Sequence, residues 1–184
     1  MNKSDLPKKP KILLTSFKTW LTYQKSNSSD DLLAIIQESN YTSIANLFFL
    51  RNLPVDIERA THQTISEIKR IQPDVIICCG MAQKRNNLTI ESNASWGNEC
   101  LYTSVDLTEL TKILMVTTIS DDAGKFVCEG LYYQVLKYIQ SQHLDLHCIF
   151  VHVPLLEADR ASILRDFQLI IGKFADKAIA RCQK

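Results

Sequence analysis

The sequence lacks both a large excess of one charge and a long run of apolar residues. Its 184 residues contain 21 Lys and Arg against 20 Asp and Glu, which gives a formal net charge of +1. A nearly neutral chain offers no broad electrostatic field for nucleic acid or an anionic membrane, so we expect neither partner. No apolar run reaches the ~20 residues of a membrane-spanning helix. The polar start MNKSDLPKKP is unlike a signal peptide. We therefore expect a cytoplasmic protein.

The sequence also lacks the cysteine spacing of a metal centre or a redox pair. No two cysteines are arranged as C-x-x-C. The neighbours Cys78 and Cys79 would point to opposite faces of a strand, so they cannot hold one ion together. We expect reduced thiols and no metal site. The six cysteines are Cys78, Cys79, Cys100, Cys128, Cys148 and Cys182.

Apolar segments of strand length alternate with amphipathic segments of helix length along the chain. This pattern predicts a single-domain α/β fold over residues 1–184, with residues 1–10 as a flexible tail. The expected architecture is a three-layer α/β/α sandwich around a largely parallel, mixed sheet. Ser28 or Ser29 is the expected N-cap of the first helix, and Asp56 that of the second. We expect strands at 11–15, 44–50, 75–79, 88–92, 113–119 and 147–153, and helices at 29–37, 57–71, 128–142 and 159–181.

Residues 122–134 place a cysteine where a glycine-containing turn becomes an amphipathic helix. Cys128 would lie in the first helical turn, where unpaired N–H groups and the helix dipole stabilise negative charge. We expect its thiol to ionise easily, and a thiolate is a nucleophile. His152 follows at the end of a predicted strand. The spacing leaves two interpretations open: a reactive Cys–His pair, or a buried cysteine and a hydrogen-bonded structural histidine.

Six motifs occur in an order that resembles one family of cysteine peptidases. They are TSFKTW (15–20), LPV (53–55), PDVIICCGMAQKR (73–85), LTIES (88–92), SDDAGKFVCEGLYY (120–133) and FVHVP (150–154). The series resembles the pyroglutamyl-peptidase I (pyrrolidone-carboxylate peptidase) family, and it covers residues 11–156. The family pattern runs roughly T-G-F-x-P-F-G-G, L-P-V, G-Q-A-G-G-R, I-x-x-E-R, A-G-x-x-V-C-N and F-I-H-V-P. The chain looks like a divergent and shortened member.

The resemblance implies a catalytic triad of Cys128, His152 and Glu91. In such a triad Cys128 attacks the acyl carbonyl, and His152 accepts the thiol proton and then protonates the leaving amine. Glu91 would orient the imidazole and favour its protonated form. The backbone N–H of Cys128 is the expected oxyanion donor. Taken alone, Glu91 would be read as an exposed carboxylate at a strand end.

The same resemblance assigns substrate binding to Phe17, Trp20 and Met81. Phe17 is retained, and Trp20 stands where the family has its second aromatic residue. Met81 replaces a glutamine that reads the polar edge of the pyroglutamyl ring, although a thioether accepts hydrogen bonds weakly and donates none. The segment between Glu91 and Cys128 is shorter than in the family. Other departures are Ser16, Leu21 and Thr22 for glycine, Thr19 for proline, Ser92 for arginine and Glu129 for asparagine.

These residues lead us to expect a cysteine-type omega peptidase without metal or organic cofactor. It would cleave an N-terminal pyroglutamyl or similar small residue from a small or N-terminally blocked peptide, through a thioester acyl-enzyme. Two alternatives stay open: a cysteine hydrolase of the same fold with altered acyl specificity, and a non-catalytic binding homologue. The retained triad favours an enzyme, whereas Met81 and Ser92 favour altered specificity. A homo-oligomer also stays open, because the family often forms dimers or tetramers.

Overall fold

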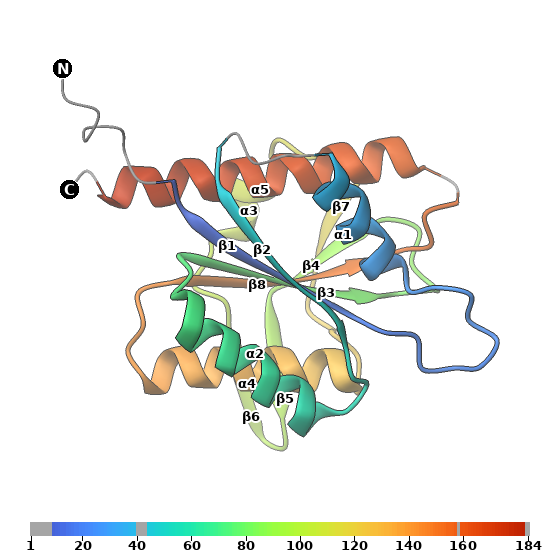
Figure 1. Ribbon diagram of the computed structural model, residues 1–184, viewed down its shortest axis with the longest axis horizontal. Helices are drawn as coiled ribbons and strands as arrows, with labels where there is room; N and C mark the ends of the chain where they lie inside the picture. The colour runs from blue at the N-terminus through green and yellow to red at the C-terminus, as the bar shows by residue number, and fades with distance from the viewer. Residues whose placement is uncertain (1–8, 40–43, 158, 183–184) are drawn as a thin grey trace.

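A six-stranded sheet in the order β2-β1-β3-β8-β4-β7 runs through the middle of the computed structural model (Figure 1). The strands are β1 (Lys11–Phe17), β2 (Asn46–Leu53), β3 (Val75–Met81), β4 (Leu88–Glu91), β7 (Thr117–Ser120) and β8 (His147–Val153). Strands β4 and β8 pair antiparallel, and the other neighbours pair parallel, which confirms the predicted mixed sheet. The structure describes residues 9–39, 44–157 and 159–182, so most of the predicted tail lies outside the described residues.

Helices cover both faces of this sheet (Figure 1). Helices α1 (Ser28–Glu38), α3 (Leu107–Thr111) and α5 (Arg160–Cys182) share one apolar cluster with the sheet. Helices α2 (Ile57–Ile71) and α4 (Val127–Ser141) share the other, together with a hairpin of β5 (Asn93–Trp96) and β6 (Glu99–Tyr102). The arrangement confirms the predicted three-layer α/β/α sandwich. Within the described part of the chain, no helix has the length and apolar character needed to cross a membrane.

The central strands are buried on both faces, which explains their nearly continuous apolar sequences. Alternate side chains point to opposite layers. On β3, Ile77 packs toward α1 and α5, whereas Ile76 packs toward α2 and α4. On β8, Val151 and Phe150 divide between the two layers in the same way. His152 has the same parity as Phe150, so β8 presents it on the face covered by α4.

The first two helices begin as their N-cap residues dictate. Asp56 caps α2 as predicted, because its side chain accepts a hydrogen bond from the backbone N–H of Arg59 at 2.8 Å. The prediction for α1 was wrong: Asn27 is the cap, and its Oδ1 accepts from the N–H of Ser29 at 3.0 Å. Ser28 lies inside the helix, where its hydroxyl donates to the backbone oxygen of Val153 at 3.0 Å. The hydroxyl that suggested a cap instead ties α1 to β8.

The prediction of a strand over residues 113–119 was only partly right. Strand β7 is confined to Thr117–Ser120. The residues before it direct their backbone N–H groups to a side chain rather than to a neighbouring strand. Met115 and Val116 donate to the buried carboxylate of Asp166 in α5, at 3.0 and 2.8 Å. The short elements α3, β5 and β6 were not predicted from the sequence.

Candidate active site

Three chain segments meet at the carboxyl ends of the parallel strands β1, β3 and β8, where α/β folds usually bind ligands. His152 is the penultimate residue of β8, and it pairs with Gly80 near the end of β3. Cys128 is the second residue of α4, which confirms its predicted place in the first helical turn. The loop after β1 carries Trp20. The sheet therefore brings the predicted nucleophile, base and acyl pocket into one region.

Gly80 leaves the space that Cys128 occupies. A Cβ atom built at Gly80 would lie 2.6 Å from Cys128 Sγ and 2.9 Å from the Phe150 ring. Real Cβ atoms essentially never make contacts this short. A glycine in a strand often marks such a close approach. The Cys128 side chain thus lies directly against the β3 backbone, beside the strand that carries His152.

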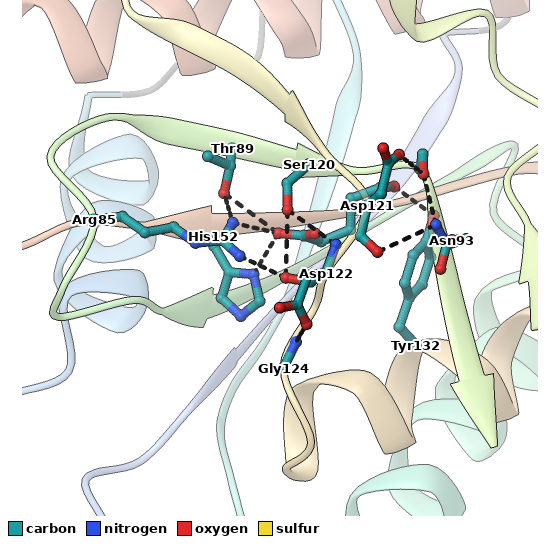
Figure 2. A network of polar contacts seen from close by, with 11 residues as sticks. Arg85, Thr89, Asn93, Ser120, Asp121, Asp122, Gly124, Tyr132 and His152 are labelled. Atoms are coloured by element: carbon teal, nitrogen blue, oxygen red, sulfur yellow. Dashed lines mark hydrogen bonds and ion pairs between the residues drawn. The ribbon is translucent and has the colours of Figure 1, made fainter. Parts of the chain in front are cut away.

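Glu91 and His152 form a buried hydrogen-bonded pair. Glu91 is fully buried and His152 is 5% exposed. Thr89 is the cross-strand partner of His152, and Glu91, two residues further along β4, lies diagonally opposite on the same face. His152 Nδ1 lies 2.7 Å from Glu91 Oε1 (Figure 2). This contact leaves Nε2 as the ring nitrogen that can exchange a proton with another group.

Glu91 is ionised at neutral pH although it is buried. Burial alone would raise its pKa. The hydrogen bond of His152, together with the charges of His152 and Arg85, holds the pKa of Glu91 below its ordinary value. Ser120 Oγ donates to Asp122 O at 3.3 Å rather than to Glu91, and Glu91 Oε2 has no hydrogen-bond partner in the described part of the chain. The polar contacts of the carboxylate therefore converge on Oε1.

Arg85 belongs to this network, although sequence reasoning did not assign it a role. Its Nη1 lies 2.5 Å from Glu91 Oε1 and also contacts the Thr89 hydroxyl. Its Nη2 donates to the backbone oxygen of Asp122 at 2.6 Å (Figure 2). The arginine was visible in the quoted GMAQKR segment, but nothing in the segment showed where its side chain would go. The structure therefore adds a cation to the Glu91–His152 pair.

Cys128 and His152 line one cavity of about 380 Å³. No hydrogen bond joins Cys128 Sγ to the His152 ring; both residues are among those described. Burial raises the pKa of Cys128 to about 12; the charge of Glu91 and the nearby Cys78 add to the rise, whereas Arg85 and a backbone hydrogen bond oppose it. The direction of this shift is opposite to the one expected for an easily ionised thiol. Its side chain points inward over β3, where loss of solvation outweighs the helix terminus.

The three predicted substrate-binding residues lie together. Phe17, Trp20 and Met81 line a small cavity of about 50 Å³ with Cys128. Sequence reasoning missed Phe126, which lines the same cavity and packs against Trp20 with 4.8 Å between ring centroids. Its position two residues before the cysteine was the available signal. Phe17 is buried, whereas Trp20 and Phe126 are 53% and 49% exposed, so the pocket has a fixed floor and an aromatic rim.

Comparison with known proteins gives a consistent result. A family model described as pyroglutamyl peptidase matches residues 97–164. The pyrrolidone-carboxylate peptidase of Oceanobacillus iheyensis is 27% identical over 198 residues, covering 94% of this chain and 96% of that protein. The chain is thus similar to the pyroglutamyl peptidase family. The Brachyspira hyodysenteriae pyrrolidone-carboxylate peptidase is 25% identical over 128 residues, 55% of this chain but only 64% of that relative.

Solved structures of family members have the same fold. Pyroglutamyl peptidase I of Bacillus amyloliquefaciens superposes with a TM-score of 0.77 at 20% identity, covering 92% of this chain and 98% of that chain. The pyrrolidone carboxyl peptidase of Thermococcus litoralis also gives a TM-score of 0.77 at 20% identity, covering 94% and 96%. Because both identities are low, these likenesses establish the fold alone and not the activity.

Two departures from the pyroglutamyl peptidase pattern make local contacts beside the site. Ser92, which replaces an arginine, donates its hydroxyl to Asp121 Oδ1 at 2.6 Å. Glu129, which replaces an asparagine, accepts the backbone N–H of Ser95 at 3.1 Å. The first contact anchors the turn before α4, and the second anchors α4 to the β5–β6 hairpin. Both replacements thus make hydrogen bonds beside the site.

The candidate site is distinguished by its chemistry rather than by its size. A larger cavity, of about 620 Å³, lies near the start of β8, beside His143 and His147. It is separate from the cavity that Cys128 and His152 share. Among the described residues, no group of three or more His, Cys, Asp or Glu side chains could hold a metal ion.

Proposed function

We propose that the protein is a cysteine peptidase that removes a pyroglutamyl or similarly small, uncharged residue from the N-terminus of a peptide. The observation that carries this proposal is the 2.7 Å contact between Glu91 Oε1 and His152 Nδ1, next to the cavity that Cys128 lines. Relatives named pyrrolidone-carboxylate peptidase support a peptidase. The residue types and their proximity match the requirements of a nucleophile, a base and an orienting carboxylate.

The first half of the proposed reaction starts from a neutral thiol. As Cys128 Sγ attacks the acyl carbonyl, Nε2 of His152 takes the thiol proton, and ionised Glu91 stabilises the imidazolium. The developing oxyanion accepts hydrogen bonds from N–H groups in the first turn of α4. These groups are available because Phe126, at the N-cap, makes no side-chain capping bond.

The second half releases the two products in turn. The imidazolium of His152 donates its proton to the leaving amine as the C–N bond breaks, which leaves the acyl group on Cys128 as a thioester. Water then attacks the thioester with His152 again as base, and the free acid leaves while the thiol regains its proton. The scheme uses only side chains and backbone groups, so it requires no metal or organic cofactor.

The lining of the acyl pocket favours an uncharged N-terminus. The described residues around the cavity of about 50 Å³ include no Asp or Glu. A protonated α-amino group would lose its hydration there without gaining an anionic partner, which is costly. A pyroglutamyl lactam or another blocked residue carries no such charge. We therefore assign N-terminally blocked peptides as the substrates.

A second candidate function is a cysteine hydrolase with a different acyl specificity. Met81 favours it, because this side chain lines the pocket where a glutamine would pair with the lactam edge. Activity also requires a reduced Cys128, and Cys128 is a free cysteine in the structure. A cytoplasmic location fits this requirement. A homo-oligomer stays a prediction.

A fluorogenic substrate panel tests the proposal. We expect turnover of pyroglutamyl-aminomethylcoumarin or of acetylalanyl-aminomethylcoumarin, and much slower turnover of unblocked alanyl and prolyl substrates. The Cys128→Ala variant should lose activity, whereas Cys100→Ala, which removes an exposed thiol, should keep it. A folded protein that turns over none of these substrates would favour the non-catalytic homologue.

A further inference from the structure

The guanidinium group of Arg85 joins two segments that carry different parts of the proposed catalytic machinery. Nη1 contacts Glu91 Oε1 at 2.5 Å, at the end of β4. Nη2 donates to the backbone oxygen of Asp122 at 2.6 Å, in the turn that leads into α4. Figure 2 shows the Arg85 side chain extending past His152 to Asp122. One planar group therefore links the carboxylate that binds His152 to the turn that precedes Cys128.

The first contact restrains the position of the Glu91 carboxylate. His152 Nδ1 and Arg85 Nη1 approach the same oxygen, Oε1, at 2.7 and 2.5 Å. The other oxygen, Oε2, is buried without a hydrogen-bond partner in the described residues. If Arg85 were removed, the fully buried carboxylate would keep the contacts of His152 and Thr89 but would lose its guanidinium partner. A buried charge that loses a partner is strongly penalised, so the carboxylate would shift to find another one.

The second contact restrains the turn that leads from β7 into α4. Within the turn, Gly124 N–H donates to Asp122 Oδ1 at 2.9 Å, and Gly124 has a φ of +83°. Asp122 is exposed and Gly124 is half-buried, whereas Ala123 between them is buried. Ser120 and Ser92 hold its beginning. Arg85 contacts the turn at the backbone oxygen of Asp122, and Cys128 follows six residues after Asp122.

We propose that Arg85 is a positioning residue that holds the Glu91–His152 pair and the turn before Cys128 in a fixed mutual geometry. Arg85 acts through these groups and does not touch the reacting atoms. The inference rests on the proposed function. A planar group with several fixed N–H donors can make both contacts at once, which a lysine ammonium cannot do with the same geometry. The positive charge of Arg85 also opposes the rise in the pKa of Cys128.

Arg85→Ala, Arg85→Lys and a control, Arg70→Ala, test the proposal. Arg70 also pairs with a glutamate, but on the surface of α2. We expect Arg85→Ala to lower kcat by ~10²-fold with KM changed only a few-fold, because small misplacements of catalytic groups have effects of this size. Arg85→Lys should recover part of the loss, and Arg70→Ala should match the natural protein. Thermal unfolding of each variant shows whether it folds.

Chemical rescue separates positioning from general stabilisation. Guanidinium ion at tens of millimolar, well below the molar concentrations that unfold proteins, should restore at least tenfold of the lost kcat in Arg85→Ala. It should not raise the activity of the natural protein or of Arg70→Ala. A folded Arg85→Ala variant with natural kcat, or one that guanidinium does not rescue, would overturn the proposal. If Arg85→Ala does not fold, natural kcat in Arg85→Lys would overturn it.

Alkylation of Cys128 provides a measurement that needs no substrate. We expect iodoacetamide to label Cys128 several-fold more slowly in Arg85→Ala than in the natural protein, with guanidinium restoring the rate. Mass spectrometry of digested protein assigns the label to Cys128. If the natural protein hydrolyses no peptide while these labelling differences appear, the proposed function fails and Arg85 still positions the thiol's surroundings. Unchanged labelling in folded Arg85→Ala would overturn the inference independently of peptidase activity.

Discussion

The proposed catalytic machinery and the acyl pocket are built in different ways. Glu91 and His152 project from strands of the central sheet and are almost fully buried, and Gly80 accommodates Cys128 against β3. The rim of the pocket consists of Trp20 and Phe126, about half exposed on the connections before α1 and α4. Residues retained from the family pattern lie mainly in the first region, and the replacements lie mainly in the second. The sheet and the first turn of α4 hold the proposed catalytic groups, and the connections around them can vary recognition.

The largest effect on the proposed catalytic machinery is expected from Glu91→Gln, which removes the charge of the side chain with little change in its shape. Loss of the orienting carboxylate of a triad can lower kcat by ~10⁴-fold, and we expect an effect approaching that size. Because Glu91 is fully buried and paired with Arg85, the substitution should also lower the free energy of unfolding, by ~3 kcal/mol. Steady-state kinetics and urea unfolding measure the two effects. Natural kcat on a confirmed substrate would show that Glu91 is structural.

A smaller effect is expected from Gly80→Ala, which tests whether the backbone of β3 fixes the thiol. The added methyl group would lie 2.6 Å from Cys128 Sγ, so the thiol or the strand must move. We expect kcat to fall by ~10²-fold and the free energy of unfolding to fall by ~1–3 kcal/mol. In a Cys128→Ala background the stability loss should shrink, because the closest clash is gone. Equal losses in both backgrounds would place the strain elsewhere.

The pocket region is tested by Met81→Gln. The lactam ring has one donor and one acceptor, and leaving either buried without a partner costs ~1–3 kcal/mol. We expect the ratio of kcat/KM for pyroglutamyl over acetylalanyl substrates to rise by about tenfold. Met81→Leu, which keeps an apolar side chain, is the matched control and should leave the ratio unchanged. A rise in neither variant would mean that residue 81 does not contact the substrate edge.

The smallest expected effect concerns the dependence of stability on pH. Glu91 has a lowered pKa in the folded protein, so its stabilising contribution is present above the unfolded-state pKa of ~4.3 and is lost as pH falls through the folded-state value. Asp30, held by Arg51, shifts in the same direction. Urea unfolding from pH 7 to pH 3 should show declining stability below pH ~4.5. The decline should be shallower in Glu91→Gln, and an equal decline would assign the effect to other carboxylates.

The sequence was sufficient for elements whose burial repeats along the chain. Strand β8 spans His147–Val153 as predicted, because both of its faces are covered and its residues form a nearly continuous apolar run. The hairpin β5–β6 was missed because its strands have four residues each and are largely exposed at β6. The entry to β7 depends on Asp166, 49 residues or more away in sequence. Such contacts leave no local pattern.

In the candidate site too, the sequence was sufficient for residues marked by a local motif and insufficient for contacts between distant segments. Cys128, His152 and Glu91 were assigned because motifs mark them, and the sheet brings His152 and Glu91 into contact. The role of Arg85 depends on the path of the loop after β3, which a sequence pattern does not specify. The pKa of Cys128 depends on the inward direction of its side chain, toward Gly80, and a helix position alone does not reveal that direction.

The central claim is that Cys128 carries the acyl group, with His152 and Glu91 as its partners. The most direct measurement is rapid acid quenching of the protein during turnover of the best substrate in the panel, followed by digestion and mass spectrometry. We expect the acyl mass on the peptide that contains Cys128, and none in His152→Ala under the same conditions. An acyl group on another cysteine, or undiminished turnover by Cys128→Ala, would contradict the account.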